Sequence, residues 1–264
     1  MNFINHFILI LLFVIFASCS KEKLNESVIK EKSLDGQVLE AYSEGLDSLR
    51  GGDVLFAAKK FNDAEMLFPQ SKWAPKSALM AAYSYYSQDY LDDAIAELDR
   101  FLLVYPLSKD RDYAIYLLAN SHYEKIVDET KDLQSILLAK KNFNRVIKQF
   151  PQTEYALDSE FKLDLINDIL ASKEMYIGRY YFDRKKWIPA INRFRTVIDE
   201  YDTTIYVEEA LHRLVEVYYT IGLINEAKKY ANILGYNYGS SRWYETSYAV
   251  FNKDYERKRI KTEK

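Results

Sequence analysis

The chain has 264 residues, of which 48% are hydrophobic and 28% are charged, and its formal net charge is −3. This composition is typical of a globular protein, and the weak negative charge argues against a nucleic-acid-binding protein, which needs a basic face. Only 8 Gly and 5 Pro occur beside 23 Tyr and 14 Phe, so we expect helices joined by short loops rather than many short strands. A single cysteine, Cys19, excludes an internal disulfide.

Residues 1–18 are typical of a secretory signal peptide. They contain no Asp, Glu, Lys or Arg, and the apolar run from Phe7 to Ala17 is shorter than the roughly 20 residues that span a bilayer. Ala17 and Ser18 precede Cys19, which resembles a bacterial lipobox, where the cysteine becomes the acylated amino terminus. Two acyl chains suffice for stable anchoring, so we expect Cys19 to carry a lipid anchor. The alternative is an uncleaved anchor helix with an incidental cysteine.

The segment after the cysteine predicts a tether. In lipoproteins of this kind, Asp in the next position favours retention in the inner membrane, so Ser20 favours the outer membrane. Residues 19–40 are mostly polar and contain no aromatic residue, which indicates a flexible link between the lipid and the folded domain.

Residues 41–252 carry an internal repeat. In five segments an Ala is followed four residues later by an apolar residue and, eight residues after that, by a breaker of the helix. An aromatic residue precedes each breaker, and a hydroxyl residue lies two positions beyond it. The five sets, with the hydroxyl residue last, are Ala57, Phe61, Pro69 and Ser71; Ala94, Leu98, Pro106 and Ser108; Ala139, Phe143, Pro151 and Thr153; Ala190, Phe194, Asp202 and Thr204; and Ala227, Ala231, Gly239 and Ser241.

This spacing predicts a unit made of a helix, a turn and a second helix. The Ala and the apolar residue lie on one helix face, and the small Ala lets a neighbouring helix approach. The hydroxyl residue can cap the next helix by accepting hydrogen bonds from its free amides. The pattern resembles the tetratricopeptide repeat. We therefore predict an all-α solenoid of five tetratricopeptide-like units, followed by a charged tail over residues 253–264.

Two segments depart from the regular period. The charged stretch at residues 125–135 predicts a loop or lengthened turn in the third unit. Between Thr153 and Tyr181 there is no Pro and only one Gly, which predicts a helix of about 28 residues, roughly 42 Å long. Pro189 falls early in the following helix, where its missing amide costs little.

The sequence contains no constellation typical of catalysis. His122 and His212 are far apart, and neither has a second histidine at the spacing of metal ligands. The "RGGD" stretch at residues 50–53 predicts a turn rather than a phosphate-binding loop. Carboxylate pairs such as Asp92 with Asp93, and Glu208 with Glu209, are expected at helix starts. We therefore expect neither an enzyme nor a bound metal or cofactor.

Tyrosines are dense on the first helices of the second and third units, which line the concave side in this repeat class. Tyrosine has a large apolar face and a polar tip, and it is favoured at binding surfaces. Tyr83, Tyr86, Tyr113 and Tyr116 are candidates for a groove that binds a substrate peptide, and the alternative is that they only pack helix against helix. For Tyr85 and Tyr123 we favour packing.

The mature chain as a whole resembles the BamD family, the lipoproteins of the outer-membrane β-barrel assembly machinery. The resemblance is most specific over residues 161–201 and 209–238, where Glu174, Gly178 and the Tyr180–Tyr181 pair precede Ala190. It implies a non-enzymatic scaffold at the periplasmic face of the outer membrane. It also implies that the last repeats bind BamA, beside other lipoproteins of the complex. The first repeats would receive unfolded outer-membrane proteins through a carboxy-terminal signal that ends in an aromatic residue. The alternative is another envelope repeat lipoprotein that serves cell-wall synthesis or division.

Overall fold

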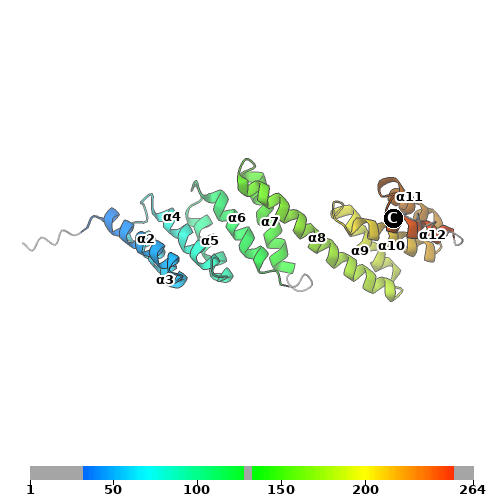
Figure 1. Ribbon diagram of the computed structural model, residues 1–264, viewed down its shortest axis with the longest axis horizontal. Helices are drawn as coiled ribbons and strands as arrows, with labels where there is room; N and C mark the ends of the chain where they lie inside the picture. Colours follow the sequence, from blue (N-terminus) through cyan, green and yellow to red (C-terminus); the bar gives the residue numbers. More distant parts are fainter. Residues whose placement is uncertain (1–31, 128–132, 253–264) are drawn as a thin grey trace, which may run out of the picture. The chain divides into compact units, whose positions relative to one another are not determined.

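The fold is entirely helical over the residues that the computed structural model describes, 32–127 and 133–252 (Figure 1). These ranges contain eleven helices and no strand, which confirms the predicted all-α class. The helices are α2 Leu34–Arg50, α3 Val54–Leu67, α4 Ala74–Tyr86, α5 Leu91–Val104, α6 Arg111–Glu124, α7 Leu133–Gln149, α8 Glu154–Asp183, α9 Trp187–Glu200, α10 Val207–Thr220, α11 Ile224–Asn237 and α12 Arg242–Phe251.

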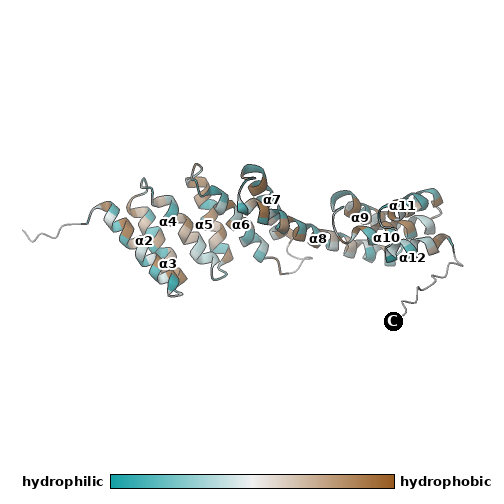
Figure 2. Ribbon diagram, turned by 45° about the horizontal axis from the view of Figure 1, so that its top comes forward, coloured by the Kyte–Doolittle hydropathy of each residue, from teal (hydrophilic) through white to brown (hydrophobic). Residues whose placement is uncertain are grey.

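Each helix packs against its neighbours in the chain. The pairs α2 with α3, α4 with α5, α6 with α7, α8 with α9, and α10 with α11 are in contact, and each pair also contacts the next. α12 follows as an additional helix that packs on α10 and α11. Most helices carry both apolar and polar segments (Figure 2), so each buries one face against its neighbours, as a tetratricopeptide-like solenoid requires.

The start of α2 differs from the expected domain boundary at residue 41. The helix begins at Leu34 and therefore includes the last part of the predicted tether. Val38 is fully buried and Ala41 almost so, in a cluster with Ala64 of α3. No clear sign of a helix before residue 41 is visible in the sequence, because the buried residues there are small and the residues between them are polar. The predicted signal peptide, Cys19, most of the tether and the charged tail lie outside the described residues.

The repeated small residues form the contacts between helices. The five Ala of the repeat, Ala57, Ala94, Ala139, Ala190 and Ala227, have no exposed surface. Phe61, Leu98, Phe143 and Phe194, four residues further along, are also fully buried. The pairing of a small residue with a large one therefore builds the core in the way that the period predicts.

Side-chain caps of the predicted kind form at two of the five turns, before α8 and α12. Thr153 Oγ1 accepts from the amide of Ala156 at 3.2 Å, and Ser241 Oγ accepts from that of Trp243 at 3.1 Å. Ser71 and Ser108 accept from amides at the turns that lead into α4 and α6, but neither is the N-cap residue and these two helices have no side-chain cap. Thr204 differs, because its Oγ1 donates to the carbonyl of Tyr201 at 2.8 Å. The expectation of an amide cap at Thr204 is therefore wrong.

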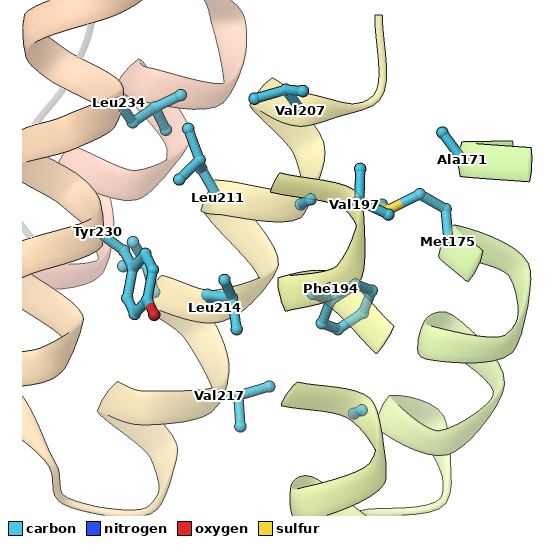
Figure 3. Packing of buried hydrophobic residues seen from close by; sticks show 13 residues of the cluster. Ala171, Met175, Phe194, Val197, Val207, Leu211, Leu214, Val217, Tyr230 and Leu234 are labelled. Carbon is cyan, nitrogen blue, oxygen red and sulfur yellow. The ribbon is translucent and has the colours of Figure 1, made fainter. Parts of the chain in front are cut away.

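The long helix is present. α8 has 30 residues, so it is about 45 Å long. Its first half contributes Ile166 and Leu170 to a cluster with α6 and α7. Its second half contributes Ala171 and Met175 to the cluster of the last helices (Figure 3). One continuous helix therefore contributes residues to two cores.

Most of the predicted turns agree with the structure where it describes them. Gly51 and Gly52 form the turn between α2 and α3, and Gly52 has a φ of +85°. Pro189 lies in the first turn of α9. α6 ends at Glu124 and α7 begins at Leu133, so the last three residues of the loop expected at residues 125–135 are helical instead, and residues 128–132 are outside the described part. None of the described helices is both long and apolar enough to cross a bilayer.

Candidate functional site

A groove of about 330 Å³ lies over the first helices of the first two hairpins and the start of α6. Its lining is mainly aromatic and aliphatic, with two lysines and one aspartate. The lining residues that matter here are Tyr42 of α2, Lys76, Met80 and Tyr83 of α4, and Lys109 and Tyr113 at the start of α6. Such a mixture of apolar rings and a few charges is typical of a site for a peptide or small ligand.

The groove lining includes two cationic side chains. Lys76 and Lys109 both line it, and Asp110 is the acidic residue in the lining. The ammonium of Lys76 lies 5.1 Å from the ring centre of Trp73. Burial is the main reason that the pKa of Tyr113 rises to about 12, so its hydroxyl stays protonated and can donate. The groove can therefore pair with one carboxylate and donate hydrogen bonds beside it.

The four candidate tyrosines do not all line the groove. Tyr83, which is 36% exposed, and Tyr113 line the groove. Tyr86 instead donates from its hydroxyl to Glu124 Oε1 at 2.6 Å, which ties α4 to α6. The structure therefore brings only half of the predicted set together at this groove.

Tyr116 also connects helices. Its hydroxyl donates to Asp158 Oδ2 at 2.7 Å, which ties α6 to α8. Its ring lies 5.0 Å from that of Tyr155. Burial first, and then the bond to Asp158, raise the pKa of Tyr116 to about 12. The two tyrosines for which we favoured packing behave as expected, since Tyr85 lies against a buried cluster and Tyr123 packs edge-on against Phe143.

The sequence analysis missed six of the groove residues, namely Leu79, Met80 and Asp110 as well as Tyr42, Lys76 and Lys109. A signal for Tyr42 was available: it stands fifteen residues before Ala57, as Leu79 stands before Ala94, and both line the groove. The lysines gave no comparable signal, because Lys76 in the first turn of α4 and Lys109 in the turn before α6 occupy positions where lysine is common on any surface.

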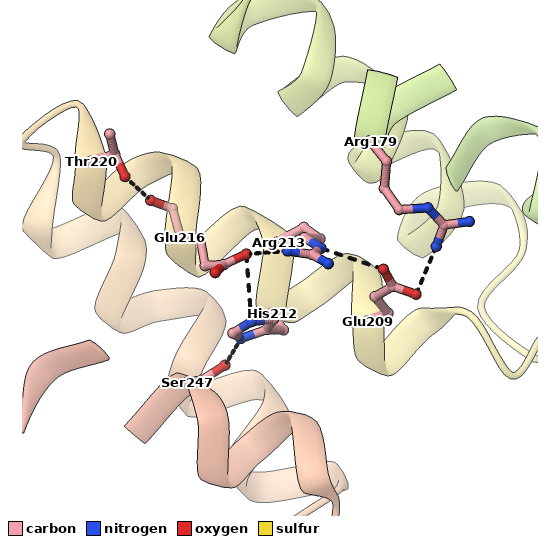
Figure 4. Close-up of polar contacts among 7 residues, drawn as sticks. All are labelled: Arg179, Glu209, His212, Arg213, Glu216, Thr220 and Ser247. Atoms are coloured by element: carbon pink, nitrogen blue, oxygen red, sulfur yellow. Dashed lines mark hydrogen bonds and ion pairs between the residues drawn. The ribbon is translucent and has the colours of Figure 1, made fainter. Parts of the chain in front are cut away.

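A polar network connects α8, α10 and α12 (Figure 4). Arg179 Nη1 donates to Glu209 Oε2 at 2.8 Å, and Arg213 Nη1 donates to Glu216 Oε2 at 2.8 Å. Arg213 also reaches Glu209, with 3.4 Å between Nε and Oε1. His212 Nε2 lies 3.5 Å from Glu216 Oε2. The network adds charge-assisted bonds to the apolar core of the last helices.

The other nitrogen of His212 reaches the last helix. Nδ1 lies 2.8 Å from the hydroxyl of Ser247. The order Ser247, His212 and Glu216 resembles that of a hydrolase triad, but Ser247 has no exposed surface. A nucleophile that no substrate can reach cannot act, so this group holds α12 on α10.

The described residues contain no group of three His, Cys, Asp or Glu side chains placed to hold a metal ion. His122 is buried, and that burial lowers its pKa. The carboxylate pairs lie in the first turns of α5 and α10, as expected. Glu209 additionally pairs with two arginines, which the sequence did not suggest.

The fold defines a helical-repeat protein of the tetratricopeptide-like class. The YfiO family model, described as "Outer membrane lipoprotein", matches residues 34–234. This chain belongs to that family.

Curated relatives bear the name outer membrane protein assembly factor BamD. The one from Rickettsia prowazekii is 39% identical over 248 residues, which cover 94% of this chain and 96% of the relative. The one from Caulobacter vibrioides is 41% identical over 211 residues, covering 80% of this chain and 69% of the relative. The one from Neisseria meningitidis serogroup A is 31% identical over 217 residues, with coverage of 78% and 81%. The resemblance to the BamD family is thereby confirmed.

Proposed function

We propose that this protein is a non-enzymatic assembly factor for outer-membrane proteins, which receives unfolded β-barrel chains in its amino-terminal groove. The observation that carries the proposal is the groove itself, where tyrosine rings and two lysines meet on successive first helices. The names of the relatives support the same role.

The chemistry of the groove suits a carboxy-terminal signal. The resemblance to the BamD family implies a substrate segment that ends in an aromatic residue and alternates apolar side chains. Tyr42, Tyr83 and Tyr113 offer rings for an aromatic residue, and Met80 offers an adaptable apolar contact. Lys76 and Lys109 can pair with the terminal carboxylate, which only the last residue of a chain possesses. The groove thereby distinguishes a chain end from an internal strand.

The proposed setting is the periplasmic face of the outer membrane. The lipobox-like sequence at Cys19 supports a lipid anchor, and Ser20 after it favours the outer membrane. The anchor would keep the groove near the site of barrel insertion without a membrane-spanning helix. No cofactor other than this covalent lipid has a role in the proposal.

The proposed partner of the last two repeats is BamA, together with other lipoproteins of the complex. The family resemblance is the basis for this partner. The unit built by α8 to α12 is suited to a lasting contact, because its core and polar network fix it. Its exposed apolar side chains include Ile188 at 74%, Ile205 at 77% and Tyr236 at 91%, which a partner could cover.

Binding of a short peptide tests the groove. The probe is the last strand of an outer-membrane protein with a free terminal carboxylate, and its amidated form is the control. We expect Tyr83→Ala with Tyr113→Ala to weaken binding about tenfold or more, since aromatic anchors carry much of the energy of such contacts. Lys76→Gln with Lys109→Gln should remove the preference for the free carboxylate.

The matched control for these variants is Tyr236→Ala, an exposed tyrosine far along the chain from the groove. It should leave peptide binding unchanged and preserve the helical circular dichroism spectrum. Capture of BamA should survive in the groove variants, because coupling between repeats is local in a solenoid. Equal binding of the free and amidated peptides to the wild-type protein would contradict the role of the lysines.

A further inference from the structure

The first half of α8 exposes a row of large apolar side chains. Leu157, Phe161 and Leu165 follow one another at intervals of four residues, and they are 59%, 63% and 49% exposed. Residues spaced in this way lie one above the other on a helix, so the row extends about 12 Å along the axis. Leaving three such side chains in water on one face is unfavourable unless a partner covers them.

A row of carboxylates runs beside the apolar row. Glu160, Asp164 and Asp168 are also spaced by four residues and occupy the adjacent strip of the same helix. Within the part of the chain that the structure describes, none of these three forms an ion pair or a hydrogen bond through its side chain. The strip therefore carries negative charge without a counterion among the residues that the structure describes.

The opposite face of the same segment is already used. Ala156, Ile166 and Leu170 are buried against α6 and α7. The flank toward α6 is closed by the bond between Asp158 and Tyr116 and by Lys162, whose ammonium lies 4.6 Å from the ring centre of Tyr123. Lys162 is thus directed away from the carboxylate row, which leaves the exposed face to a partner from outside.

We propose that this face of α8 docks an amphipathic helix of a partner protein, one that carries an apolar row beside a row of Lys or Arg. A ridge of side chains four residues apart packs into the groove between equivalent rows of a second helix. The three carboxylates then pair with the basic row, which fixes the direction and register of the partner. Negative charge beside the apolar row disfavours an anionic lipid surface as the occupant. The site shares no residue with the lining of the amino-terminal groove.

The proposal is tested with residues 32–264, which contain the whole compact unit that begins at Leu34. The probe is a fluorescein-labelled helical peptide of Leu, Ala and Lys, with Leu in one row and Lys in the adjacent row. Its control has Glu in place of Lys. Fluorescence anisotropy should show that the Lys peptide binds and that the Glu peptide binds about tenfold more weakly or not at all.

Two variants assign the binding to this face. A triple variant should bind the Lys peptide about tenfold more weakly or worse; it carries Leu157→Ala, Phe161→Ala and Leu165→Ala. Its melting temperature should stay nearly unchanged, because the three side chains are exposed. Glu160→Lys, Asp164→Lys and Asp168→Lys together should reverse the preference in favour of the Glu peptide. A control with Leu103→Ala and Leu107→Ala, which are 81% and 97% exposed and belong to neither proposed binding surface, should bind like the wild type.

Three results would overturn the proposal. The first is undiminished binding of the Lys peptide to the triple alanine variant. The second is a wild-type dimer in size-exclusion chromatography that the same variant converts to a monomer, which would make a second copy the occupant. The third is binding to phosphatidylglycerol vesicles with no binding of the Lys peptide, which would make a lipid surface the occupant.

Discussion

The ring of Phe194 occupies the space in which a Cβ atom on residue 178 would stand. An ideal Cβ built on Gly178 would lie only 2.5 Å from Phe194 Cε1. The same relationship recurs in the first hairpin, where a Cβ on Gly45 would lie 2.8 Å from Phe61 Cε1. Where the small residue is Ala82, the facing buried residue in the cluster is Leu98. A small residue on the first helix of a hairpin thus makes room for a large buried side chain on the second helix.

Gly178→Ala should destabilise the protein. The added methyl would force the buried Phe194 ring to move, and overpacking of this kind typically costs about 1 to 3 kcal/mol. Alanine in a helix interior is favoured over glycine by up to about 1 kcal/mol, so we expect urea unfolding to show a net loss of about 1 kcal/mol in the free energy of unfolding. Gly51→Ala is the control, because its nearest atoms lie at 3.4 Å, in ordinary contact. A Gly178→Ala variant as stable as the wild type would show that the ring can shift.

Glu65→Ala should loosen the contact between the first two hairpins. Glu65 is only 7% exposed, accepts from Arg100 Nη1 at 2.9 Å and accepts from the Tyr105 hydroxyl at 2.6 Å. Removing a buried partner leaves the others unpaired, and we expect a loss of about 2 kcal/mol in the free energy of unfolding, since Arg100 remains partly solvated.

The comparison for Glu65→Ala is Asp47→Ala. Asp47 forms an ion pair with Arg50 in which both side chains are more than 70% exposed, at 72% and 76%. Exposed pairs contribute little, so this variant should unfold at nearly the wild-type urea concentration. Equal effects of the two substitutions would count against a structural role for the Glu65 cluster.

The network around Glu216 should make the free energy of unfolding depend on pH in the acidic range. Burial acts to raise the pKa of Glu216, but His212 and Arg213 outweigh it, so its pKa is lowered. A carboxyl group with a lowered pKa in the folded state stabilises the protein above its ordinary pKa of 4.5, and this contribution is lost as the pH falls through the lowered value. Urea unfolding between pH 7 and pH 3 should therefore show a loss of stability that is smaller in Glu216→Gln. An identical acid profile for both proteins would contradict this assignment.

Cys19→Ala should release the protein from the membrane. If Cys19 carries the lipid, metabolic labelling with a fatty-acid analogue will mark the wild type and leave the variant unlabelled. The variant should then appear as an uncleaved precursor or as a soluble periplasmic protein on fractionation. Equal labelling of the two proteins would exclude the anchor and favour an uncleaved amino-terminal helix.

Features that depend on residues close together in the sequence were mostly predicted correctly, and the length of α8 is an example. The length of α8 could be predicted because no breaker occurs between Thr153 and Tyr181, and a cap lies at the start. The failure at Thr204 is local too, since a hydroxyl at a turn can either accept from an amide or donate to a carbonyl. The early start of α2 was missed because small buried residues such as Ala41 give a weak periodic signal.

The sequence by itself determined the order of helices and turns and the repeated small-to-large contacts. These follow from residues within one helix or one hairpin, whose spacing is visible along the chain. Only the tertiary structure decided that Tyr83 and Tyr113 line a groove while Tyr86 and Tyr116 bond to carboxylates of neighbouring helices. The same residue type on the same helix face takes either role, because its partner is supplied by a helix about forty residues away, as in the 38 residues between Tyr86 and Glu124.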